Sequence, residues 1–114
     1  MSGIGAAVAG VIAALPATAD RVEVVGNTEL AAALRTELGE QAAPASDEAP
    51  SAVIETSGDL DSIVRALESV DDLGTVLLAG PPPAGPTPLD LYAHLHVRGL
   101  TLLGMPGLAT PDPR

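Results

Sequence analysis

The chain has 114 residues with fifteen acidic side chains, five arginines, no lysine and no cysteine, and its net charge is −10. Such a surface repels phosphate backbones and anionic lipids, so nucleic acid and membrane surfaces are disfavoured as partners. Without Lys or Cys, Schiff-base chemistry, thiolate catalysis, disulfides and cysteine-ligated zinc are excluded. The length fits a single domain, and with no Phe or Trp its core must consist of small aliphatic side chains.

The first segment, Met1 to Leu15, is apolar after a glycine-rich start and predicts a helix. Pro16 ends it, because proline lacks an N–H donor and disfavours helical geometry in the residue before it. Ala17-Thr18-Ala19 matches a signal-peptide cleavage pattern, but no basic residue precedes the apolar run, which is also too short to span a bilayer. We therefore expect a cytoplasmic protein.

The middle of the chain alternates strands rich in β-branched residues with helices that have apolar side chains at three-four spacing. The predicted elements are a strand at Arg21–Val25, a helix at Glu29–Leu38, a strand at Ala52–Glu55, a helix at Asp59–Val70 and a strand at Thr75–Ala79. Between the helix at Glu29–Leu38 and the strand at Ala52–Glu55, residues 40–50 are rich in Ala, Pro and acids. They leave room for a short edge strand near Ala42 at most, and for no crossover helix.

The C-terminal part begins with a stiff proline-rich loop at Gly80–Pro86. Thr87-Pro88-Leu89-Asp90 then has the form of a capping box and predicts a short helix to about Leu95. The last strand is expected at Arg98–Leu103. Strands alternating with helices predict an α/β fold with a parallel sheet, whose ligand edge lies at the strand C-termini. We expect one domain over residues 1–104 and a proline-containing tail at 105–114.

Three segments carry a family resemblance. Val53–Gly58 is a strand that ends in Glu-x-x-Gly, Gly74–Gly80 is the next strand, and Leu91–Gly104 is a helix followed by a strand. In this order they resemble the cofactor-binding half of the medium-chain dehydrogenase/reductase family, the zinc-type alcohol and polyol dehydrogenases. The resemblance extends from about Gly3 to Gly104, and it implies a reduced Rossmann-like sheet.

Several departures from the family pattern limit what the resemblance implies. Gly3 and Gly5 would be the first two glycines of the G-x-G-x-x-G turn, but Val8 replaces the third. Gly26 stands where the family usually has the acid that binds the ribose. The family's first strand, its zinc ligands and its catalytic domain have no counterpart, so zinc-dependent dehydrogenase activity is not expected. Residues 22–25 must then pair directly with residues 52–55, or a partner chain must fill the gap.

A retained cofactor site would bind NAD(P) at the strand ends. The resemblance places it at Gly3, Gly5, Gly26, Asn27, Thr56, Ser57, Gly58 and Gly80. The alternative is structural: the glycines allow tight packing, and Ser57 or Asp59 is the cap of the following helix.

Four side chains are the only plausible acid/base groups: Glu55, Ser57, His94 and His96. Glu55 lies in an otherwise apolar strand, where burial would raise its pKa, although such a residue commonly bonds to neighbouring backbone. Two histidines alone do not complete a zinc site, so we expect structural histidines and no metal.

Two functional hypotheses follow. The favoured one is a non-catalytic or accessory protein that binds a nucleotide or small metabolite, or that assists a partner enzyme. The other is a small enzyme that reuses the dehydrogenase remnant for NAD(P)-linked or acid/base chemistry with Glu55, His94 or His96. In either case the strand at Arg98–Leu103 is a sheet edge with little protection, and we expect a homodimer through it.

Overall fold

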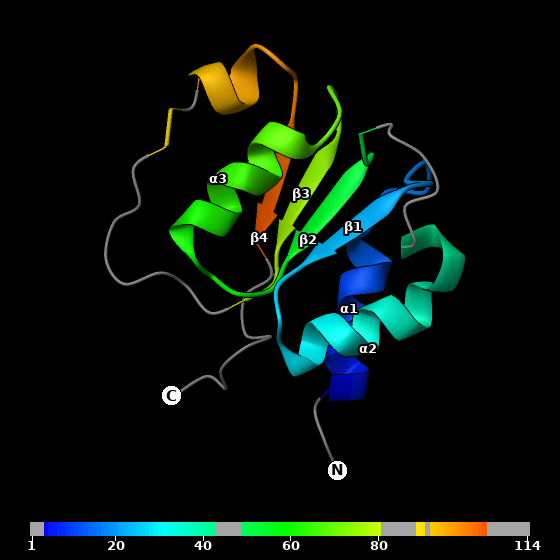
Figure 1. Ribbon diagram of the computed structural model, residues 1–114. Helices are drawn as coiled ribbons and strands as arrows, with labels where there is room; N and C mark the ends of the chain where they lie inside the picture. Colours follow the sequence, from blue (N-terminus) through cyan, green and yellow to red (C-terminus); the bar gives the residue numbers. More distant parts are fainter. Residues whose placement is uncertain (1–3, 43–48, 81–88, 91, 105–114) are drawn as a thin grey trace, which may run out of the picture.

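The computed structural model describes residues 4–42, 49–80, 89–90 and 92–104, and shows an α/β fold with helices on both sides of a four-stranded sheet (Figure 1). Its elements in chain order are α1 (Ile4–Ala14), β1 (Val22–Val25), α2 (Glu29–Leu38), the 3₁₀ helix η1 (Gly39–Ala42), β2 (Ala52–Glu55), α3 (Leu60–Ser69), β3 (Thr75–Leu78), the π-helical turn η2 (Tyr92–His96) and β4 (Thr101–Gly104). The predicted fold class is confirmed.

All strand pairs are parallel, and the strand order is β1-β2-β3-β4. Val24 lies opposite Ile54 in the β1–β2 pair, so the strand at residues 22–25 pairs directly with the strand at 52–55. Of the two arrangements that the sequence left open, the direct pairing is therefore the one found.

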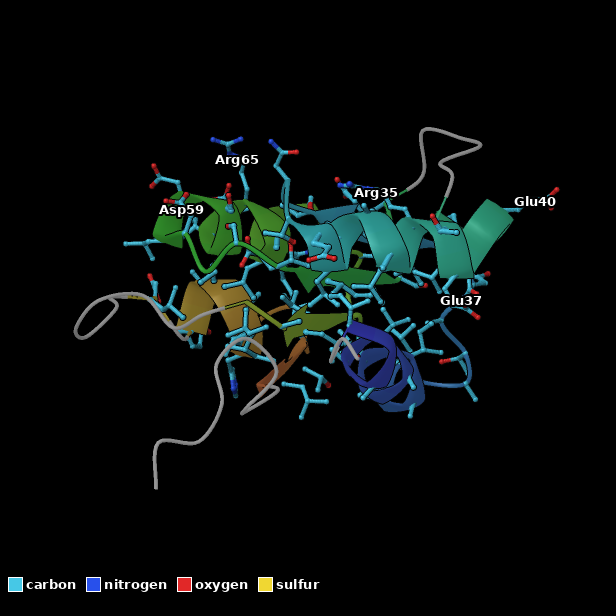
Figure 2. All side chains as sticks on the ribbon, turned by 90° about the horizontal axis from the view of Figure 1, so that it is seen from below. Arg35, Glu37, Glu40, Asp59 and Arg65 are labelled. Carbon is cyan, nitrogen blue, oxygen red and sulfur yellow. The ribbon has the colours of Figure 1, made fainter. Side chains whose placement is uncertain are left out.

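Each face of the sheet has its own hydrophobic core because side chains alternate along a strand. Ile54 and Leu77 belong to the core that includes α1, whereas Val53 and Val76 belong to the core under α3. Figure 2 shows α1 and α3 on opposite sides of the sheet. The central strand β2 is buried along its whole length, as a parallel strand covered on both faces should be.

Helix α2 protects the outer edge of β1. Its N-cap is Thr28, whose hydroxyl accepts from the Ala31 N–H at 3.0 Å. One turn before its end, the Arg35 guanidinium donates to the carbonyl oxygens of Val24 and Gly26 at 2.8 and 3.0 Å. These bonds occupy backbone acceptors that an edge strand otherwise offers to another chain. Beyond the edge, α2 contacts α1.

Two sequence-based predictions are corrected. The chain forms the 3₁₀ helix η1 at Ala42, where we expected at most an edge strand. The last strand begins at Thr101, not Arg98. Arg98 bonds instead to the carbonyl oxygens of Leu67 and Val70 at the end of α3. The last carbonyl oxygens of a helix have no partner within the helix, and the charged guanidinium donates to them. Such charge-assisted hydrogen bonds are stronger than the neutral backbone bonds that a strand position would offer.

Most of the proline-rich segment after β3 is outside the described part of the chain. Thr87 and Pro88 of the expected capping box, the loop at residues 81–86 and the tail at 105–114 lie outside the described residues. Within the described part, Asp90 Oδ1 accepts from the Ala93 N–H at 3.0 Å, as an acid near a helix start does. The short helix expected to about Leu95 is found at Tyr92–His96, and it is π-helical. No helix in the described ranges is long and apolar enough to cross a membrane.

Candidate functional site

The carboxyl ends of the strands form the edge of the sheet where Rossmann-like folds bind ligands. Three turns meet there: residues 26–28 after β1, 56–59 after β2, and 79–80 after β3. Figure 1 shows the N-terminal ends of α1, α2 and α3 at this same end of the molecule. The edge therefore has the general layout of a nucleotide site. Its side-chain contacts determine whether space for a ligand remains between the turns.

Glu55, the last residue of β2, is fully buried and folds back onto its own turn. Its carboxylate accepts from the backbone N–H of Ser57 at 3.1 Å and of Gly58 at 2.8 Å, and from the Ser57 hydroxyl. Both carboxylate oxygens thus have donors within three residues. These contacts agree with the structural alternative, in which Glu55 bonds to neighbouring backbone.

Thr56 joins the ends of β1 and β2. Its hydroxyl donates to the Val25 carbonyl at 2.8 Å and accepts from the Thr28 hydroxyl at 2.9 Å. Gly26, which has a φ of 121°, lies against it, and a Cβ at Gly26 would overlap Thr56 Oγ1. Glycine is needed here because the backbone is left-handed and the neighbouring turn is in contact.

Gly80 makes the same kind of contact from the other side. A Cβ at this position would lie 2.6 Å from the Thr56 carbonyl carbon and 2.7 Å from the Gly58 nitrogen. Gly26 and Gly80, two positions expected at a cofactor site, therefore approach their own chain closely. The turn after β2 fills the space between the ends of β1 and β3.

Ser57, another residue expected at the cofactor site, bonds within the start of α3. Gly3 lies outside the described residues, and Gly5 and Asn27 are exposed. The Ser57 hydroxyl accepts from the Asp59 N–H at 3.1 Å, and Asp59 Oδ2 in turn accepts from the Ser62 N–H at 3.2 Å. Asp59 is therefore the N-cap of α3, as the structural alternative held.

The histidines lie away from this edge. His96 belongs to η2, which precedes β4 and lies at the opposite end of the sheet from the β2 turn (Figure 1). It is exposed, and its ring stacks on Tyr92 with centroids 5.3 Å apart. His94 lies on the same turn, and its side chain is outside the described set. In the described parts of the chain, no group of three or more His, Asp or Glu side chains could hold a metal ion.

Sequence reasoning missed two side-chain contacts of this region. Nothing in the sequence indicated that the Thr28 hydroxyl bonds to Thr56, twenty-eight residues away. Nor did it indicate that Arg35 bonds to the edge of β1. The bond between Thr28 and Thr56 depends on the direct pairing of β1 with β2, which the sequence left open.

Taken together, the parallel sheet, its strand order and its flanking helices define a reduced Rossmann-like α/β fold. A similar solved structure is the alcohol dehydrogenase TADH from Thermus sp. ATN1, with a TM-score of 0.63 and 24% sequence identity. The match covers 90% of this chain and 40% of that chain. The chain thus spans well under half of the dehydrogenase, and the likeness shows the fold. No protein-family profile and no curated protein sequence matches the chain.

Proposed function

We propose that the chain is an accessory protein, a Rossmann-like domain that acts by association and has no catalytic turnover of its own. The observation that carries this proposal is the turn after β2, whose backbone occupies the space between the ends of β1 and β3. A doubly wound sheet opens its ligand crevice where the strand order reverses, and the described order β1-β2-β3-β4 has no reversal. Strand ends that pack against the chain's own turn, without such a crevice, support a role in binding partners over a role in chemistry.

The distribution of acid/base groups supports the same proposal. A small enzyme using Glu55 with His94 or His96 would need these groups within hydrogen-bond reach of one substrate. Glu55 is buried in the β2 turn with both oxygens bonded, whereas His96 is exposed at the opposite end of the sheet. The two groups therefore do not share a site.

Binding of NAD(P) is the second candidate function. The N-terminal end of α1 lies at the same end of the molecule as the strand ends, where Rossmann folds bind dinucleotide phosphates (Figure 1). The similar structure is also that of an alcohol dehydrogenase. Against this candidate, Gly26 offers no side chain to a ribose hydroxyl, and it contacts Thr56 instead.

Thermal denaturation with NAD, NADP and their reduced forms separates these candidates. A nucleotide at a hundred times its Kd stabilises the folded state by about 2.7 kcal/mol, which raises the Tm measurably. We expect no shift with any of the four nucleotides and no change in NAD(P)H absorbance with alcohols or aldehydes. A saturable shift would make nucleotide binding the function, and turnover of any of these substrates would refute the accessory role.

We further infer that two copies pair through β4. It is the terminal strand of the described sheet, and its residues Thr101, Leu103 and Gly104 are exposed and uncharged. An unprotected edge of this kind pairs readily with a second strand. Light scattering should give twice the chain mass of 11.3 kDa. Leu103→Lys should give a monomer, while Leu73→Lys, at another exposed leucine, should not. A monomeric wild-type protein at micromolar concentration would refute the pairing.

A further inference from the structure

The outer side of α1 is apolar and uncovered in the described chain. The helix, Ile-Gly-Ala-Ala-Val-Ala-Gly-Val-Ile-Ala-Ala, contains no polar or charged side chain. Only Ala7, Val8 and Val11 are buried against the sheet, whereas Ala6, Ala9 and Ala13 are exposed. A helix that covers one face of a domain normally has polar side chains on its outer side. The composition of α1 is that of a helix buried on more than one side.

A groove runs between α1 and α2 and has a volume of about 730 Å³. Ile4, Val8 and Ile12 from α1 and Ala33 from α2 supply most of its apolar lining. Gly5 also lines the groove, and within the described chain no atom beyond the helix's own backbone lies within 4 Å of where its Cβ would be. The groove therefore has the apolar floor and the open access that a docked helix needs.

The charge at the rim is negative. Thr36 and Glu37 of α2 line the groove, and Figure 2 shows Glu40 just beyond the end of the same helix. Arg35 is the one cation of α2, and it bonds to the carbonyl oxygens of Val24 and Gly26 at the edge of β1. Among the described residues no cation lines the groove, and the net charge of the chain is −10. Electrostatic complementarity favours an occupant with basic side chains.

We propose that this groove, defined by its α1 residues Ile4, Val8, Ala9 and Ile12 and by Ala33 and Glu37 of α2, binds an amphipathic helix of a partner protein. The partner helix presents apolar side chains at three-four spacing to the floor, and Lys or Arg to the acidic rim. A second copy of this chain fits less well, because a two-fold contact here would bring its Glu37 rim toward a like charge. The inference deepens the proposed accessory function and rests on it.

The test uses a fluorescein-labelled peptide of about fourteen residues, slightly longer than α1, made of Leu, Ala and Lys with Leu at helical three-four spacing. Two control peptides are measured beside it. One has the same composition with the Leu positions scrambled, and the other has Glu in place of Lys. Fluorescence anisotropy with the full chain measures binding. We expect the amphipathic basic peptide to bind at least about tenfold more tightly than either control.

Two substitutions on one helix separate groove binding from general attraction to an acidic protein. Ala9→Glu places a charge in the groove, while Ala6→Glu places the same charge on an exposed position of α1 that does not line it. Both substitutions make the protein more acidic, so unspecific binding of a basic peptide would rise with each. We expect Ala9→Glu to weaken binding by about tenfold or more and Ala6→Glu to change it by less than about twofold.

Reversal of the rim charge gives an independent readout. Glu37→Lys should weaken peptide binding several-fold, whereas Glu68→Lys, an exposed charge on α3, should have little effect. Equal effects of Ala9→Glu and Ala6→Glu, equal binding of the scrambled peptide, or no binding at all would overturn the proposal. So would a wild-type dimer that Ala9→Glu converts to a monomer, because a second copy would then cover the groove. None of these outcomes depends on the nucleotide assay, so the two proposals fail separately.

Discussion

Glycines occupy two regions of this molecule whose surroundings are opposite. At the strand ends, a side chain at Gly26 or Gly80 would overlap the turn after β2. On α1, the described chain places no atoms beyond the helix's own backbone within 4 Å of where a Cβ of Gly5 or Gly10 would lie. Contacts within the described chain explain the first pair of glycines but not the second. The strand ends are thus a closely packed region, and the outer side of α1 is a region where the described chain leaves space.

Among substitutions that test this comparison, the largest change in stability is expected at the closely packed strand ends. Gly80→Ala forces a methyl group against the backbone of Thr56 and Gly58, which has no free side-chain end to give way. We expect a loss of about 3 kcal/mol in the free energy of unfolding, measured by urea denaturation. Gly10→Ala is the matched control, since the described chain leaves open space around that glycine. Equal stability of the two variants would show that the strand ends are not closely packed.

A smaller effect is expected at the carboxylate beneath that turn. Glu55→Gln keeps the shape of the side chain, but its amide nitrogen replaces one of the two acceptors that receive the N–H groups of Ser57 and Gly58. A buried donor left without an acceptor costs about 2 kcal/mol. Urea denaturation of this variant beside Glu68→Gln, an exposed substitution, measures the difference. If Glu55→Gln left stability unchanged, the turn would not depend on the carboxylate.

The smallest effect, and one of opposite sign, is expected on α1, where the described chain leaves space. Gly10→Ala lies within α1, does not line the groove, and finds free space for its methyl group. Alanine is favoured over glycine in a helix interior by about 1 kcal/mol, so the variant should be more stable than the wild type. A rise in Tm in thermal denaturation would confirm it. A fall would show that the outer side of α1 is already covered in solution.

Local sequence signals predicted those parts of the fold that depend on neighbours along the chain. The bounds of α2 and β2 agree with the structure, and so does Asp59 as the cap of α3, because β-branched runs, leucine spacing and capping residues act locally. Arg98 was misassigned to a strand because a long side chain reached the end of α3, about thirty residues earlier. The closed strand ends could not be predicted, since Gly26 and Thr56 meet only after β1 pairs with β2.

The guanidinium of Arg35 has a consequence for how copies of this protein assemble. With the carbonyl oxygens of Val24 and Gly26 already bonded, β1 is a poor template for an added strand, while β4 has no such guard in the described chain. If two copies join through β4, both outward edges of the pair are then β1. Under the proposed pairing growth would stop at two, because Arg35 occupies the backbone acceptors that a further strand would need, and the chain would not extend into fibrils.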